Sequence, residues 1–213
     1  MPDRKYPKRP YLLVALTGGF GSGKSTVSSM FAERYPVLNS DLIAAEVIAG
    51  SESVRLQIRE AFGGAVFDSS GRLDRTALAR VAFADDAHAS KLNRIVHPPT
   101  IAEIQSRAHG AAHAGGLVIV ESALVYEARL ENHFDAVIAV VARQETVLRR
   151  AAEAGRFTEH DVLARLARQL APEEKAARAD IVLHNDGTIE ELRSATTMAL
   201  IVLEAIARKH AGA

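Results

Sequence analysis

Five short apolar runs recur along the chain, and each predicts a β-strand. They cover residues 12–16 (LLVAL), 37–39 (VLN), 117–120 (LVIV), 136–141 (AVIAVV) and 181–183 (IVL). Most are apolar at consecutive positions, which is typical of strands buried on both faces between layers of helices. Helical stretches separate the runs. This alternation predicts an α/β fold built on a parallel sheet.

Residues 51–113 are too long for a simple crossover between strands and have a mostly helical pattern. Helix N-caps are expected at Ser51, Asp74 and Asp85. Gly63-Gly64 and the SSGR turn at 69–72 interrupt the pattern, and Pro98-Pro99 is expected to restart the chain. We therefore predict a helical insertion beside the sheet, where an acceptor substrate could be recognised.

A second helical zone spans residues 144–178. Thr158 and Asp161 have the T-x-x-D spacing of a capping box, in which two side chains cap a helix start reciprocally. Thr188 and Glu191 give the same pattern, T-x-x-E, before the last helix. Both pairs predict helix starts.

Composition narrows the class of protein. The chain has 213 residues, 48% of them hydrophobic and 24% charged, with a formal net charge of zero. This fits one domain, or a core with small insertions, and it gives no reason to expect nucleic acid or membrane partners. The absence of cysteine excludes disulfides and thiolate zinc sites. No run is long enough for a membrane span, and the basic start lacks the apolar core of a signal peptide. We expect a cytoplasmic monomer or weak homo-oligomer.

The stretch LTGGFGSGKSTV after the first strand contains the pattern G-x-x-x-x-G-K-[ST], the phosphate-binding P-loop. Glycines let the backbone approach an anion, and successive amide N–H groups converge on it at the start of a helix. Lys24 can reach the β- and γ-phosphates, and the Ser25 hydroxyl can ligate Mg²⁺. The predicted nucleotide-binding residues are Gly18, Gly19, Phe20, Gly21, Ser22, Gly23, Lys24, Ser25 and Thr26.

The nucleotide and the reaction are less directly encoded. No N-K-x-D motif for reading guanine occurs, so ATP is favoured over GTP. A P-loop serves kinases, ATPases and GTPases alike, so the acceptor must be identified from other residues.

Two carboxylates follow predicted strands at the edge of the sheet where ligands bind. Asp41 could orient or deprotonate an acceptor hydroxyl, or hold magnesium through water, and it could equally cap a helix beginning at Leu42. Glu121 ends an apolar run as in a Walker B motif and is a candidate to support magnesium. A solvated strand-end cap is the alternative for Glu121.

With these residues in place, the chain resembles the dephospho-CoA kinase family from about Leu12 to Leu192. The resemblance includes the P-loop, then SDLIAAEVI, where the family has D-A-D-x-I-A-x-x-V. It continues in GRLDRTALARVAFAD, LNRIVHP and ESALVYE, and ends in ARLARQLAPEEKAARADIVLHNDGT. The order and spacing of these later segments are far more specific than the P-loop alone.

The resemblance implies a P-loop NTPase fold with a five-stranded parallel sheet flanked by helices, a helical acceptor-binding insertion and a lid. It assigns 11–50, 114–143 and 179–213 to the nucleotide-binding core, 51–113 to the CoA-binding region and 144–178 to the lid. The implied reaction moves the γ-phosphate of ATP, with Mg²⁺, to the ribose 3′-hydroxyl of dephospho-CoA, the last step of coenzyme A synthesis.

The resemblance also implies roles for single residues. Asp41 matches the aspartate that acts as base or orients the acceptor, beside Lys24 in the catalytic set. Arg149 and Arg165 match lid arginines that contact the transferring phosphate, although arginines in such helices are usually solvated. The acceptor side is lined by segments that contain Arg75, His97 and Leu124.

The chain departs from the family pattern at three places. Asn39 replaces the first aspartate of D-A-D, and Ser122-Ala123 replaces the usual x-Pro turn before Leu124. Glu153 stands where the family often has arginine, and Arg156 is a candidate substitute. These departures concern the acceptor loop and the lid more than the reaction.

Two alternatives stay open at this level. One is another small-molecule P-loop kinase, acting on a nucleoside or nucleotide. The other is a non-enzymatic protein whose nucleotide-dependent lid engages a protein partner.

Overall fold

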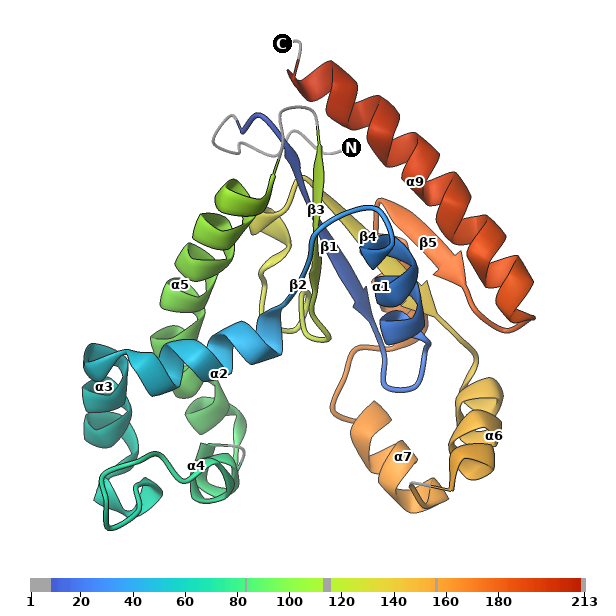
Figure 1. Cartoon of the computed structure of the whole chain (residues 1–213). Coiled ribbons are helices and arrows are strands. Elements are labelled where there is room, and N and C mark those ends of the chain that lie inside the picture. The colour runs from blue at the N-terminus through green and yellow to red at the C-terminus, as the bar shows by residue number, and fades with distance from the viewer. Residues whose placement is uncertain (1–8, 83, 113–115, 156, 212–213) are drawn as a thin grey trace. The chain divides into compact units, whose positions relative to one another are not determined.

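A computed structural model describes residues 9–82, 84–112, 116–155 and 157–211 (Figure 1). It forms two compact units, one made of Ser40–Arg107 and the other of the described residues on either side of that segment. Residues 40–50, which the family resemblance assigns to the nucleotide-binding core, belong to the compact helical unit that begins at Ser40. The assignment of functions to the three regions stays a prediction.

The first unit contains a five-stranded parallel sheet, as the apolar runs predict. Its strands are β1 (Leu12–Gly18), β2 (Val37–Asn39), β3 (Leu117–Glu121), β4 (Ala136–Val141) and β5 (Ile181–His184). The spatial order is β2-β3-β1-β4-β5, so β1 lies in the centre, paired with β3 on one side and β4 on the other. The two central pairings bring the carboxyl end of β1 beside those of its neighbours.

Helices pack on this sheet because its central strands are apolar on both faces. The elements that contact the strands are α1 (Lys24–Ala32), α8 (Pro172–Arg178) and α9 (Ile189–Ala211), whereas α6 (Gln144–Ala154) and α7 (Glu159–Leu166) pack on each other. On one face, Phe31 of α1 and Leu203 of α9 join Leu16 of β1 in a single buried cluster. Figure 1 shows α1 and α9 on this side of the strands. At about 25 cal/mol per Å² of apolar surface, such burial is the main stabilising term for the sheet.

In the described part of the second unit the regular elements are helices, apart from one isolated bridge between Phe67 and Leu73. It contains α2 (Ser40–Gly50), α3 (Glu52–Phe62), the short 3₁₀ turn Gly64–Val66, α4 (Arg75–Ala82) and most of α5 (Asp86–Ala111). Ile58, Leu78 and Val96 meet in its core. The predicted caps are confirmed, because side-chain oxygens of Ser51, Asp74 and Asp85 accept backbone N–H bonds at the helix starts.

Two local predictions were wrong. Pro98-Pro99 does not restart the chain, because α5 continues through both prolines. Proline φ suits a helix, and only two backbone donors are lost, while Val96 and Ile104 are buried on either side. Asp41 is not an N-cap of a helix starting at Leu42, since α2 begins one residue before it, at Ser40.

The capping boxes at Thr158 and Thr188 are confirmed. For α9, the Thr188 hydroxyl accepts from the Glu191 amide at 3.2 Å, and the Glu191 carboxylate accepts from the Thr188 amide at 2.8 Å.

Thr188→Ala should therefore lower the free energy of unfolding by about 1 kcal/mol, because a helix packed on the main core loses its cap. Urea denaturation measures this. Thr197→Ala, an exposed position within α9, is the control and should change stability by less than about 0.5 kcal/mol; equal effects at the two positions would contradict the cap assignment.

Candidate functional site

The P-loop connects β1 to α1 and takes the conformation that its glycines predict. Gly21 and Gly23 have φ of 71° and 93°, a left-handed backbone that side chains rarely adopt. Gly23 is the N-cap of α1, and no side chain of the described residues caps this helix start. This helix start is thus open to an anion, which the helix dipole favours there.

Gly23 is also fixed by a neighbour from the far end of the chain. The Nδ2 of Asn185, which follows β5, donates to the Ser22 carbonyl at 2.8 Å. A Cβ atom at Gly23 would overlap that nitrogen. The loop conformation therefore depends on glycine at position 23 and on the contact from Asn185.

Gly23→Ala should weaken ATP binding about a hundredfold, because a left-handed alanine is strained and Asn185 must give up its hydrogen bond. Calorimetric titration with a non-hydrolysable ATP analogue measures this. Gly50→Ala is the matched control, because a Cβ there meets open space and φ is not positive. An unchanged affinity in Gly23→Ala would show that the loop does not need this conformation.

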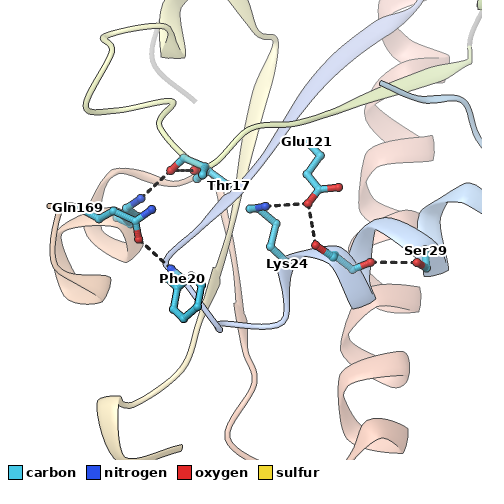
Figure 2. Close-up of polar contacts among 9 residues, drawn as sticks. Thr17, Phe20, Lys24, Ser29, Glu121 and Gln169 are labelled. Carbon is cyan, nitrogen blue, oxygen red and sulfur yellow. Dashed lines mark hydrogen bonds and ion pairs between the residues drawn. The ribbon is translucent and has the colours of Figure 1, made fainter. Parts of the chain in front are cut away.

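Lys24 and Glu121 meet beside the carboxyl ends of β1 and β3 (Figure 2), and Ser25 contacts the same glutamate. The Lys24 Nζ and the Ser25 Oγ both donate to Glu121 Oε1, at 2.7 Å and 3.0 Å. The lysine and glutamate side chains are only 16% and 11% exposed, so this pair is poorly screened by water. The P-loop cation is therefore held beside a carboxylate at the place where the triphosphate is expected.

The Glu121 carboxyl has a lowered pKa. Burial alone would raise the pKa, but hydrogen bonds from Lys24, Ser28 and Ser25, together with the Lys24 charge, outweigh it. Because this pKa lies below the ordinary 4.5, the stabilisation that ionised Glu121 gives the fold is fully present at pH values well above 4.5. That contribution is lost as the pH falls through the lowered value.

The difference in unfolding free energy between the wild type and Glu121→Gln should therefore be constant near neutral pH and should shrink at acid pH. Urea denaturation at a series of pH values between about 3 and 7 measures it. A difference that does not depend on pH would contradict the ion pair. Glu33→Gln, in an exposed pair with Arg193, provides the control for a solvated carboxylate.

The oxygen atoms of Ser25 and Glu121 are hard donors of the kind that Mg²⁺ prefers. Within the described parts of the chain, no group of three or more His, Asp or Glu side chains could hold a metal ion. The donor set therefore suits an ion that takes most of its ligands from phosphates and water.

A cleft of about 800 Å³ lies over the P-loop. Besides the loop it is lined by Ala123, Arg150, Gln169, Asn185 and Ile189. Its size is in the range of small-molecule sites. Arg150 donates to the carbonyls of Asn185 and Gly187, at 2.9 Å and 3.3 Å, and so holds the turn after β5 at the edge of the cleft.

Sequence reasoning missed Gln169, Arg150 and Asn185 as site residues. Gln169 Oε1 accepts from the Phe20 amide of the P-loop at 2.8 Å, as Figure 2 shows. The only signal available was that Gln169 and Asn185 lie in RLARQ and HNDGT. These segments carry the family resemblance, but the resemblance assigned no role to either residue.

The two predicted lid arginines are placed differently. Arg165 of α7 lies over the rings of Phe20 and Phe157, 5.1 Å and 4.8 Å from their centroids, which places it beside the P-loop. Arg149 of α6 forms an exposed pair with Glu153 at 2.9 Å. Glu153, which stands where the resemblance leads us to expect a cation, therefore pairs with Arg149. Such an exposed ion pair contributes little free energy, so Arg149 can leave it for another partner. Arg156 lies outside the described residues.

The predicted acceptor residues lie in both units. Asp41 is exposed in the first turn of α2, Arg75 is exposed at the start of α4, and His97 is half-buried in α5. Leu124 belongs to the sheet unit, on the loop after β3, and is 44% exposed. Their roles stay predictions.

None of the helices within the described ranges combines the length and apolar character that crossing a membrane requires.

Comparisons with known proteins agree with the site. A family model for dephospho-CoA kinase matches residues 12–191. A curated dephospho-CoA kinase from Deinococcus radiodurans is 41% identical over 205 residues, which cover 95% of this chain and 97% of that protein.

Solved structures give the same picture of the fold. The crystal structure of TT1252 from Thermus thermophilus has a TM-score of 0.77 and 34% identity, and the match covers 91% of this chain and 98% of that one. A dephospho-CoA kinase from Campylobacter jejuni has the same fold at a TM-score of 0.66 and 19% identity, with 91% and 97% covered. The P-loop, the sheet order and these matches together show that the chain belongs to the dephospho-CoA kinase family.

Proposed function

We propose that the chain transfers the γ-phosphoryl group of ATP to the ribose 3′-hydroxyl of dephospho-CoA, giving coenzyme A and ADP. The observation that carries this proposal is the phosphate-binding loop at the centre of the sheet, in a chain that belongs to this family. The remaining residues are assigned to the steps that such a transfer requires.

The triphosphate binds to the amides of residues 18–25 and the first turn of α1. Lys24 exchanges its bond with Glu121 for the β- and γ-phosphates, which offsets charge in the transition state. The nucleoside end lies in the cleft between Arg150 and Ile189. Ser25 and Glu121 would hold Mg²⁺, and the ion would neutralise phosphate charge when bound.

The acceptor is activated by Asp41, whose carboxylate takes the proton of the 3′-hydroxyl. The bond from this oxygen to the γ-phosphorus forms as the bond to the β-γ bridging oxygen breaks, and ADP leaves. Arg75, His97 and Leu124 bind the rest of dephospho-CoA. Arg149 and Arg165 approach the transferring group from the lid and help to exclude water.

The test is ADP release by the purified protein with ATP and a panel of acceptors. Dephospho-CoA should support turnover, and adenosine and nucleoside monophosphates should not. Turnover of another nucleoside or nucleotide without turnover of dephospho-CoA would refute the acceptor. ATP binding with no phosphorylated product from any acceptor would favour a nucleotide-dependent switch.

A further inference from the structure

Lys175 is the most unusual charged residue of the described chain, because its side chain is fully buried in the sheet unit. It lies in α8, and its Nζ donates to Glu127 Oε1 at 2.8 Å and to the Ala123 carbonyl at 2.9 Å. Burying an ammonium group is costly, and apolar residues of similar volume often stabilise a fold equally well. A function beyond stability would explain why charges occupy this place.

The pair connects two of the segments that carry the family resemblance. Glu127 ends ESALVYE, and Lys175 ends the EEK of the later segment. Neither takes part in the proposed chemistry. Their contact is made across a sequence separation of 48 residues, so no local pattern predicts it.

Glu127 also holds the connection between α7 and α8. Its Oε1 accepts from the backbone amide of Leu170 at 2.9 Å. The preceding residue is Gln169, whose side-chain oxygen accepts from the Phe20 amide of the P-loop at 2.8 Å. The fixed amide at position 170 therefore determines where the Gln169 side chain begins.

Lys175 holds the other side of the same network. The Ala123 carbonyl that it contacts also accepts from the Thr17 hydroxyl at 3.3 Å, at the end of β1. Thr17 immediately precedes the first P-loop glycines (Figure 2). The buried pair therefore holds both segments that contact the phosphate-binding loop. One is the segment of Leu170, next to Gln169, and the other is the segment of Ala123.

We propose that Glu127 and Lys175 are positioning residues for ATP. They fix Leu170, so that Gln169 stays on the Phe20 amide and the P-loop keeps the shape that accepts the triphosphate. The proposal rests on the proposed function only in taking the P-loop as the ATP site. It does not depend on which acceptor is phosphorylated.

A purely stabilising role is separated from positioning by two double variants that both remove the buried charges. Glu127→Gln with Lys175→Met keeps an oxygen for the Leu170 amide. Glu127→Leu with Lys175→Met has no such oxygen. Calorimetric titration with a non-hydrolysable ATP analogue, well below the melting temperature of each protein, compares them.

The leucine double variant should bind the analogue about tenfold more weakly than the glutamine double variant, because the partly buried Leu170 amide has lost its acceptor. It should also show faster hydrogen exchange at the Phe20 amide. Equal affinity and equal exchange in the two variants would overturn the proposal, because the pair would then only stabilise the fold.

Gln169→Leu keeps the proposal testable if the double variants fail to fold, since it leaves the buried pair intact. It should weaken binding of the ATP analogue to a similar extent, about tenfold. In the leucine double variant it should add little, because both changes act on the same contact. Wild-type affinity in Gln169→Leu would overturn the proposal. A variant that loses activity with dephospho-CoA but keeps wild-type affinity for the ATP analogue would bear on the acceptor, and not on the role of the Glu127–Lys175 pair.

Discussion

Asp41→Asn should lower kcat with dephospho-CoA by about 10²–10⁴-fold and should leave the affinity for ATP within about twofold of the wild type. Asparagine has the same shape as aspartate but cannot take the proton of the ribose hydroxyl. Steady-state kinetics with dephospho-CoA, together with titration of an ATP analogue, separates the two quantities.

The control is Glu46→Gln, a second carboxylate on α2 that forms an ion pair with Arg107 at 2.7 Å. It should leave kcat within about twofold, since Glu46 has no part in the proposed chemistry. If Asp41→Asn lowered kcat and ATP affinity equally, a magnesium or folding role for Asp41 would replace the catalytic one.

Lys24→Met should lower kcat/KM for ATP by about 10²–10³-fold, the usual effect of removing one preorganised donor from a developing charge. The variant also leaves the Glu121 carboxylate without its cation beside the phosphate site, which repels the nucleotide. Initial rates at varied ATP concentration measure the loss.

Lys91→Met is the matched control, because Lys91 is an exposed lysine whose Nζ contacts the Ala61 carbonyl in the helical unit. It should change kcat/KM by less than about twofold. Similar losses in both lysine variants would contradict a special role for Lys24. Lys24→Arg should not restore activity fully, since the planar guanidinium does not reproduce a point charge.

Much of the fold could be predicted from the sequence, because the strands are apolar at consecutive positions and lie between helical patterns. The strand positions and the parallel arrangement were confirmed. The order β2-β3-β1-β4-β5 could not be deduced from those runs, since an apolar run does not specify its neighbours. The interruption expected at Pro98-Pro99 does not occur, because burial of the surrounding side chains outweighs a local helix breaker.

The candidate site, like the fold, could be predicted from the sequence only in part. The P-loop was predictable because its chemistry is local, with glycines, Lys24 and Ser25 within eight residues. Gln169 and Asn185 were not predicted, because they reach the loop from 149 and 163 residues away. Only tertiary structure brings such partners together. The pairing of Lys175 with Glu127 is a third case.

The central claim is that residues 18–25 hold ATP with its terminal phosphate directed toward Asp41. A crystal structure of the ternary complex with dephospho-CoA and a non-hydrolysable ATP analogue tests it most directly. We predict that an Asp41 carboxylate oxygen lies about 2.6–3.2 Å from the ribose 3′-oxygen, which in turn faces the γ-phosphorus. A carboxylate turned away from that hydroxyl, or another group in its place, would contradict the account.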